Sequence, residues 1–516
     1  MVENGAMKDT GKALTVLALN TVAFTVCFAC WMLNGVLVTF LVEHQVFRLT
    51  ESQIGWLIGI PVLSGSIIRL PVGILTDKYG GRLVYTAVML VSAIPMVLLS
   101  MADGFWSFFF ASLGFGLAGT SFAVGIAYTS VWFPKERQGT ALGVFGMGNA
   151  GAALTTLGAP TLLAWLTNHG EDIEAWRTMP RVYAAALVVM AVVFFLLSHS
   201  RKVDDSHITS FSQRLRPLRH VRVWRFGLYY FLVFGGFVAL AQWLVPYYVN
   251  AYLMPLAMAG LMASIFSLPS GVIRALGGWM SDRWGARRVM YWVLGSCLIC
   301  CTLLIVPRMD IESPGRGVMA KRGGVVTSVS PTEIAIGNTR YPLIADKEEA
   351  LTPEQKMHQV LVWPTVSSWQ EPVVHEGDQV AKKQLLARGV THIYFQANVW
   401  IFTALVFIVG IMMGIGKAAV YKHIPEYFPK EVGVVGGIVG VLGGLGGFVC
   451  PIIFGYLLEW TGIWTTCWVF FAILSGICLW WMHRVVQRML REAAPELMSK
   501  IEEIEHAMER QKPRER

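Results

Sequence analysis

The chain has 516 residues, of which 55% are hydrophobic and 15% are charged, and its mean hydropathy is +0.54. This composition excludes an ordinary soluble protein and indicates a polytopic membrane protein. The net charge of +9 arises largely in short loops between apolar runs. It therefore indicates cytoplasmic loops rather than binding of nucleic acid.

Apolar runs long enough to cross a bilayer recur along the chain and predict an all-α polytopic membrane protein. We place twelve transmembrane helices at about residues 13–41, 52–76, 82–101, 105–132, 138–166, 180–199, 223–249, 256–281, 287–307, 397–424, 433–458 and 463–484. Lysine and arginine concentrate in alternate loops, so the positive-inside rule places those loops and both termini in the cytoplasm. We expect a multi-pass protein of the plasma membrane, the inner membrane of a bacterium.

A repeated segment divides the helices into two pseudo-symmetric halves of six. At one constant spacing, the matched pairs are Arg69 and Arg274, Gly73 and Gly278, Asp77 and Asp282, Gly80 and Gly285, and Arg82 and Arg287. A second repeat, Phe133 to Glu136 and Phe428 to Glu431, precedes a Gly-rich helix in each half. The predicted parts are an N-terminal bundle at 13–199, a cytoplasmic linker at 200–222, a C-terminal bundle at 223–307 and 397–484, an inserted module at 308–396 and a cytoplasmic tail at 485–516.

Arg69 and Arg274 lie inside apolar runs at equal depth. In a helix, about 12 Å separates Arg69 from Asp77, which brings the arginine near the bilayer midplane. An arginine there costs about 2.5–3.5 kcal/mol on insertion scales, so a matched pair indicates an anion site. The guanidinium fork suits a planar oxyanion. The alternative is a pair of structural arginines bonded to backbone carbonyls.

The non-membrane segment 308–396 interrupts the second half. Short alternating runs such as Gly324–Val329 and Thr332–Ile336 predict a small β-rich module. We expect it on the extracytoplasmic face, because the predicted helix before it runs outward. The stretch from Glu371 to Leu386 resembles the half-motif of barrel-sandwich hybrid domains, although the modified-lysine signature of true carriers is absent.

The segments from Gly73 to Arg82 and from Gly278 to Arg287 resemble the signature loop of the major facilitator superfamily. In that family the acidic and basic residues of this loop latch the cytoplasmic helix ends in one state of the transport cycle. The resemblance therefore implies gating roles, not ligand contacts, for Asp77, Arg82, Asp282 and Arg287.

Two Gly-rich helices, from Gly143 to Pro160 and from Gly436 to Pro451, resemble the nitrate-signature helices of the nitrate/nitrite porter family. Together with the paired arginines, this resemblance covers the membrane part of the chain. Small residues at this spacing let neighbouring helices approach closely and narrow the cavity, although generic helix packing would also explain them. We place four glycines among the substrate-binding residues: Gly148, Gly151, Gly443 and Gly446.

Three further residues complete the predicted substrate site. Asn149 lies among the glycines, where an amide can donate to an oxyanion without adding charge. The family resemblance implies aromatic and hydroxyl contacts on the seventh helix, where Tyr230 and Phe234 fall one turn apart. These two could equally be core residues.

Lys417 departs from the family pattern, because relatives commonly have a neutral polar residue at this place in the tenth helix. It lies too deep for comfortable snorkelling to the interface. Two roles stay open: a structural charge that reaches a backbone carbonyl, or a part in proton coupling. Asn34, in the first helix, is expected to form a helix–helix hydrogen bond.

The leading hypothesis is a transporter for nitrate or nitrite that works by alternating access, as a nitrate/proton symporter or a nitrate/nitrite antiporter in nitrate assimilation. It is not an enzyme, and we expect no cofactor, metal or nucleic acid; its partners are the anion, the bilayer and possible coupling protons. One alternative is a porter of another small anion. Another is a membrane sensor or docking protein that acts through the insertion.

Overall fold

The computed structural model describes residues 2–200, 216–346, 364–428 and 432–493. Parts of the predicted linker 200–222, of the second repeat Phe428 to Glu431 and of the tail 485–516 lie outside these residues. The chain divides into two compact units, described in turn. The helical unit comprises Met1–Leu303, Leu405–Gly462 and Thr466–Arg516, and the β unit comprises Leu304–Ala404 with Ile463–Thr465.

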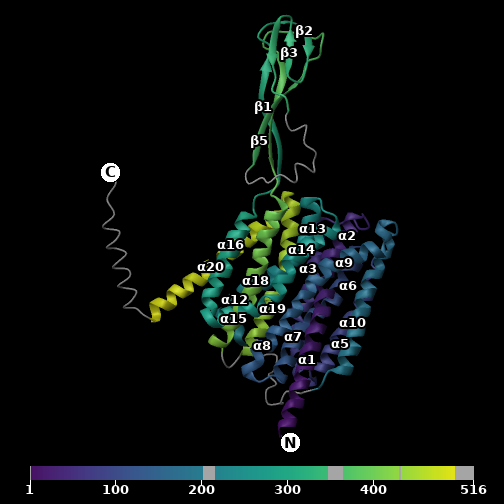
Figure 1. Cartoon of the computed structure of the whole chain (residues 1–516), viewed down its shortest axis with the longest axis vertical. Helices are drawn as coiled ribbons and strands as arrows, with labels where there is room; N and C mark the ends of the chain where they lie inside the picture. Colours follow the sequence, from purple (N-terminus) through teal and green to yellow (C-terminus); the bar gives the residue numbers. More distant parts are fainter. Residues whose placement is uncertain (1, 201–215, 347–363, 429–431, 494–516) are drawn as a thin grey trace, which may run out of the picture. The chain divides into compact units, whose positions relative to one another are not determined.

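The helical unit contains both repeated halves (Figure 1). Its first half is built from α1 (Val2–Trp31), α2 (Leu33–Glu43), α3 (Glu51–Ile67), α4 (Arg69–Tyr79), α5 (Gly81–Leu99), α6 (Phe105–Phe115), α7 (Ser121–Trp132), α8 (Lys135–Gly146), α9 (Gly151–Leu166) and α10 (Thr178–Leu197). Short 3-10 helices lie at η1 (Gly116–Thr120), η2 (Met147–Ala150), η3 (Asn168–Gly170) and η4 (Ile173–Arg177).

The second half contains α12 (Val221–Tyr230), α13 (Gly236–Tyr252), α14 (Leu256–Val272), α15 (Arg274–Trp284), α16 (Ala286–Leu303), α18 (Val399–Tyr427), α19 (Val432–Thr461) and α20 (Thr466–Ala493). A 3-10 turn, η6 (Arg216–Arg219), precedes α12, and a π-helical turn, η7 (Phe231–Gly235), joins α12 to α13.

Ten helical stretches of the described residues are long and apolar enough to cross a membrane, and the bent pair of α14 and α15 makes an eleventh. The helix predicted at 138–166 is interrupted by η2 and is divided between α8 and α9, each shorter than these spans. Glycines at 146, 148 and 151 weaken the helix here, and the Asn149 side chain bonds the backbone carbonyl of Gly146.

Each repeated arginine begins a helix after a break at the residue before it. Ile68 separates α3 from α4, and Ile273 separates α14 from α15, with nearly equal backbone angles (φ −74°, ψ −7° and φ −65°, ψ −8°). Both short helices then end at a glycine with positive φ, Gly80 at 85° and Gly285 at 83°. Glycine adopts this conformation without the penalty of a side chain. The sequence repeat is therefore also a backbone repeat.

The two halves meet along helices that approach closely at glycines. A β-carbon at Gly55 of α3 would overlap the Pro451 carbonyl of α19, and one at Gly455 of α19 would overlap the Glu51 carbonyl of α3. On the other side of the interface, a β-carbon at Gly260 of α14 would overlap the Thr156 carbonyl of α9. Backbones this close leave no room for side chains between them.

The β unit holds two antiparallel sheets. Its strands are β1 (Met309–Met319), β2 (Gly324–Val329), β3 (Glu333–Ile336), β4 (Thr339–Pro342), β5 (Thr365–Pro372), β6 (Gln379–Val380) and β7 (Leu385–Phe395). The sheet orders are β1-β7-β5 and β4-β3-β2-β6. Met309 pairs with Phe395, and a register shift follows Gly315, where β1 bends.

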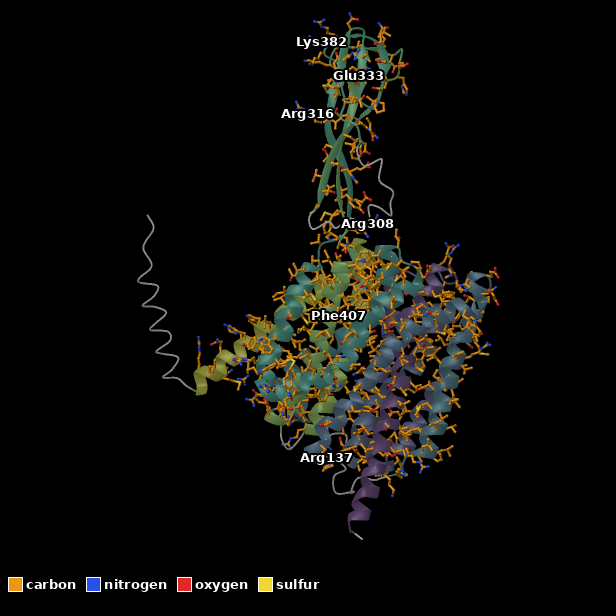
Figure 2. All side chains as sticks on the ribbon, viewed as in Figure 1. Arg137, Arg308, Arg316, Glu333, Lys382 and Phe407 are labelled. Carbon is orange, nitrogen blue, oxygen red and sulfur yellow. The ribbon has the colours of Figure 1, made fainter. Side chains whose placement is uncertain are left out.

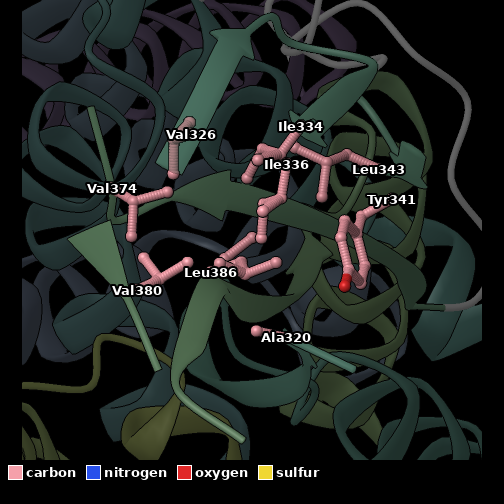
Figure 3. Packing of buried hydrophobic residues seen from close by; sticks show 10 residues of the cluster. Ala320, Val326, Ile334, Ile336, Tyr341, Leu343, Val374, Val380 and Leu386 are labelled. Carbon is pink, nitrogen blue, oxygen red and sulfur yellow. The ribbon is translucent and has the colours of Figure 1, made fainter. Parts of the chain in front are cut away.

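Buried aliphatic residues fill the core of the β unit (Figure 3), among them Val326, Ile334 and Leu386. Charged side chains such as Arg316 and Lys382 lie on its outside (Figure 2). The Trp369 indole and the Arg388 guanidinium donate hydrogen bonds to the Glu371 carboxylate, which holds the pKa of Glu371 below its usual value. The alternating pattern of the sequence thus corresponds to real strands.

Candidate functional site

Arg69 joins the two halves of the helical unit. Its side chain is 4% exposed; Nε donates to the Gly119 carbonyl at 3.3 Å, and Nη1 donates to the Gly440 carbonyl of α19 at 3.1 Å. Nη2 has no hydrogen-bond partner among the described residues. The two carbonyl bonds are those of the structural alternative, and Nη2, without a partner in the described chain, is available to donate to an anion.

Arg274 lies opposite in the second half and is half-buried. Its guanidinium carbon is 5.5 Å from the ring centre of Tyr421, and its Nη1 has no hydrogen-bond partner among the described residues. In the described part of the chain, no carboxylate pairs with Arg274 or with Arg69. Within the described residues, one buried and one half-buried arginine thus lie near each other without a carboxylate counter-ion, an arrangement that favours an anionic ligand.

The Phe122 ring of α7 lies close to the guanidinium groups of both arginines. Its centre is 5.3 Å from the guanidinium carbon of Arg69 and 5.6 Å from that of Arg274. The Trp31 ring of α1 also lies 5.5 Å from the guanidinium carbon of Arg69. Phe122, Trp31 and Tyr421 are not among the predicted site residues, because no sequence motif distinguishes them from the many other aromatic residues of the spans.

Tyr230 and Phe234 lie in the same aromatic cluster. Their rings stack with centres 5.0 Å apart, and Phe234 is 5.5 Å from the guanidinium carbon of Arg69. Tyr230 also meets the Tyr421 ring edge-on at 5.0 Å, and its hydroxyl has no hydrogen-bond partner in the described chain. The π-helical turn η7 begins directly after Tyr230, as such turns often do at functional sites.

The four predicted glycines lie at helix contacts around this cluster. A β-carbon at Gly443 would overlap the Tyr230 ring, and one at Gly446 would lie 2.6 Å from the Phe231 carbonyl oxygen. In the first half, β-carbons at Gly148 and Gly151 would overlap α1. These glycines bring the helix backbones close to the aromatic side chains that surround the arginines.

Asn149 is fully buried in η2, beside Arg274. Its Nδ2 donates to the Gly146 carbonyl at 2.9 Å, and a β-carbon at Gly146 would lie 3.1 Å from Cδ of Arg274. An amide nitrogen carries two hydrogens, so the second stays available for a ligand. Oδ1 of Asn149 lacks a hydrogen-bond partner within the described residues.

Several buried polar atoms at this centre lack hydrogen-bond partners among the described residues. Besides the groups already named, Ser66 Oγ and Ser270 Oγ are buried and lack hydrogen-bond partners among the described residues. A β-carbon at Gly444 would overlap Ser66 Oγ and would lie 3.4 Å from Nη1 of Arg69, so Ser66 is at the arginine. Buried polar groups are usually satisfied, and a cluster of unsatisfied ones fits a polar ligand.

Lys417 of α18 lies next to this site and is fully buried. Nζ donates to the Ser270 carbonyl at 3.2 Å and is 3.3 Å from the centre of the Phe237 ring. Ser270 lies one helical turn before Arg274. Asn34, by contrast, bonds the Leu57 carbonyl and the Ser112 hydroxyl, a helix–helix contact within the first half.

The predicted gating residues Arg82, Asp282 and Arg287 contact helices of their own half. Nε of Arg82 donates to the Phe195 carbonyl of α10 at 2.8 Å. In the second half, the Asp282 carboxylate is 2.6 Å from Nζ of Lys422 in α18, and Arg287 donates to the Tyr427 hydroxyl at 3.0 Å. The fourth, Asp77, is half-buried near the end of α4. The site and the gates are therefore separate groups of residues.

Comparison with known proteins gives the class of the fold. The model of the Major Facilitator Superfamily matches residues 19–332 and 385–508. A solved bacterial homolog of the human lysosomal transporter Spinster, in an inward-facing and occupied conformation, superposes with a TM-score of 0.60 at 13% identity, over 92% of this chain and 96% of that one. The fold is that of a multi-pass membrane transporter.

Two curated relatives narrow the family. The probable nitrate/nitrite antiporter NarK1 of Thermus thermophilus is 38% identical over 96% of both chains. The nitrite extrusion protein of Bacillus subtilis is 24% identical over 90% of this chain and 91% of its own length. The chain belongs to the nitrate/nitrite porter family of the Major Facilitator Superfamily. This membership supports the prediction that it is not an enzyme, and its bacterial relatives support a bacterial inner membrane.

Proposed function

We propose that the protein carries nitrate or nitrite across the membrane by alternating access around Arg69 and Arg274. The observation that carries the proposal is the pair of arginines against one Phe122 ring. Among the described residues, each has a guanidinium nitrogen without a hydrogen-bond partner, and neither has a carboxylate partner. A small anion placed between them receives charge-assisted hydrogen bonds from both halves. The names of the relatives support the same substrate class.

Nitrate suits this environment for a geometric reason. It is planar, as is the guanidinium group, and the two can form parallel hydrogen bonds. Tyr230 and Asn149 add donors without adding charge, and the surrounding rings exclude water. Low local polarity strengthens each of these interactions.

Alternating access follows from the repeated architecture. We propose twelve transmembrane helices, with α8, η2 and α9 together forming the fifth, both termini in the cytoplasm and the insertion 308–396 outside. On this topology, the close contacts at Gly55, Gly455 and Gly260 lie at the extracytoplasmic ends of the helices. Rocking the halves apart there would open the arginines to that side, with Asp77, Arg82, Asp282 and Arg287 closing the other.

The direct test is flux in proteoliposomes of the purified protein. We expect nitrate uptake that depends on internal nitrate or nitrite, and competition by nitrite but not by chloride or formate. Equal competition by the organic anion would favour the alternative of a general small-anion porter. Absence of any anion flux by folded protein would contradict the proposal.

Two coupling modes remain open within this proposal. Two fixed positive charges are only half cancelled by one nitrate, so a bound anion that is needed for closure would enforce exchange. Proton symport instead needs a group that can release a proton. Lys417 is the candidate, because it is buried beside Arg274 and has no acidic partner among the described residues.

Lys417→Met separates these modes. We expect the variant to keep nitrate/nitrite exchange and to lose any nitrate accumulation that an imposed proton gradient drives, because methionine fills the space without carrying a proton. Lys12→Met, at an exposed lysine, is the control and should change neither flux. If gradient-driven uptake survives in Lys417→Met, the lysine is a structural charge bound to the Ser270 carbonyl.

Asn149→Ala tests the amide. We expect nitrate affinity to weaken by about 1–3 kcal/mol, the cost of removing a hydrogen-bond partner in a dry site, with transport still measurable. Asn34→Ala is the matched control: Asn34 is equally buried but bonds only protein groups, so its loss should lower thermal stability and leave apparent affinity unchanged. Equal nitrate affinities in wild type and Asn149→Ala would show that Asn149 only packs between helices and does not bind the anion.

A further inference from the structure

A second basic site lies at the other end of α12, far along the chain from Arg69. A pocket with an enclosed volume of about 20 Å³, partly open to solvent, is lined by α12, α16, α18 and α20. This enclosed space is about that of one water molecule, so a larger ligand would bind at the open side of the pocket. The polar lining comes from Arg225, Arg287, His423 and Tyr427.

Arg225 is the unexplained residue of this pocket. Its side chain is 7% exposed, and it makes no hydrogen bond or ion pair with any residue that the structure describes. Arg222 and Arg287 are close enough for their positive charges to repel that of Arg225. Its guanidinium carbon lies 5.3 Å from the Phe226 ring centre, and a buried arginine without a counter-ion among the described residues is a candidate to bind an anion.

The neighbouring contacts hold the cationic groups around one tyrosine. Arg287 donates to the Tyr427 hydroxyl at 3.0 Å, and the guanidinium carbon of Arg222 is 5.2 Å from the centre of the Tyr427 ring. The nearby acid, Glu426, lies 3.5 Å from Nδ1 of His423, which itself lines the pocket. Two arginines, Arg225 and Arg287, therefore line the pocket, and no carboxylate in the described residues forms an ion pair with either.

The side of the pocket formed by α20 is apolar. Met482, Val485, Val486 and Met489 of α20 line it, and the last three are half-exposed. A free inorganic anion gains nothing from such a wall, whereas a lipid places its glycerol and first methylenes there. A cationic end beside an exposed apolar helix face is the chemistry that an anionic phospholipid recognises.

We propose that this pocket binds the phosphate headgroup of an anionic phospholipid of the cytoplasmic leaflet, with Arg225 as its principal ligand and Arg287 as the second. The proposal rests on the topology given above, which places this end of α12, α16 and α18 in the cytoplasm, but not on nitrate as the substrate. Because Arg287 belongs to the repeated gating loop, the lipid links that loop to α12 and α20.

The test uses purified full-length protein in detergent, with phosphatidylglycerol, phosphatidylcholine or inorganic phosphate as the probe. Native mass spectrometry measures retained lipid, and the unfolding midpoint is followed in parallel. We expect wild type to retain phosphatidylglycerol over phosphatidylcholine, and Arg225→Gln to bind phosphatidylglycerol at least fivefold more weakly. Arg484→Gln is the matched control, since Arg484 is an exposed arginine of α20 that contacts Trp480 and does not line the pocket.

Three outcomes decide the question. Selective loss of phosphatidylglycerol in Arg225→Gln, with Arg484→Gln unchanged, supports the proposal. Equal retention in all three proteins overturns it, and displacement of the lipid by millimolar phosphate overturns the assignment to a lipid. If Arg225→Gln fails to fold, Arg225→Lys takes its place, because lysine keeps the positive charge but lacks the planar guanidinium group. Arg225→Lys should weaken phosphatidylglycerol binding at least threefold. Unchanged binding by Arg225→Lys overturns the proposal. Binding is measured without transport, so a failed nitrate assay leaves this result intact.

Discussion

Replacement of Arg69 or Arg274 with lysine is expected to abolish nitrate transport while the protein stays folded. Arg69 uses Nε and Nη1 on the carbonyls of Gly119 and Gly440 and has Nη2 left for an anion. A lysine ammonium cannot reproduce this planar fork. Loss of two charge-assisted hydrogen bonds, at about 1.5–3 kcal/mol each, predicts a fall of roughly a hundredfold or more in transport efficiency.

The measurement is initial nitrate flux in proteoliposomes, with size-exclusion chromatography and thermal unfolding to report on folding. Arg177→Lys is the matched control. Arg177 also donates to two backbone carbonyls, those of Ser100 and Ala102, but it lies in η4 beside Asp103, outside the site. Its replacement should lower stability and spare flux. Wild-type flux in either Arg69→Lys or Arg274→Lys would refute a two-arginine site.

Phe122→Leu is expected to have the next largest effect, because one ring contacts both guanidinium groups. Leucine keeps most of the apolar volume but removes the π face, and cation–π contacts are worth about 0.5–2 kcal/mol each. Both arginines would also lose the ring that orients them. We therefore predict at least a tenfold loss of nitrate transport efficiency, expressed mainly as weaker apparent affinity.

Phe108→Leu separates this effect from ordinary packing. Phe108 is fully buried in the same half and meets Phe47 edge-on, with no arginine contact among the described residues. Both variants should lose similar thermal stability, and only Phe122→Leu should lose affinity. Equal transport by the two variants would show that Phe122 is a packing residue and that the arginines do not depend on it.

Local physical constraints explain what could be predicted. An arginine in an apolar span raises the free energy of membrane insertion whatever the span packs against. A left-handed backbone conformation with positive φ favours glycine in any fold. The pairs Arg69 and Arg274, and Gly80 and Gly285, therefore stand out in the sequence and recur as matched helix breaks and helix ends. Helix length was less predictable at 138–166, because the break at η2 depends on glycine packing against α1.

The sequence by itself determined the family, the repeated halves and the two arginines, since each rests on composition or on spacing along the chain. Only the tertiary structure decided which aromatic rings meet those arginines. Phe122, Trp31 and Tyr421 come from three different helices, and their convergence depends on how each helix is rotated and how closely glycines let neighbours approach. Arg225 emerged in the same way, because its burial without a hydrogen bond or ion pair among the described residues is a property of the folded surroundings and not of the residue.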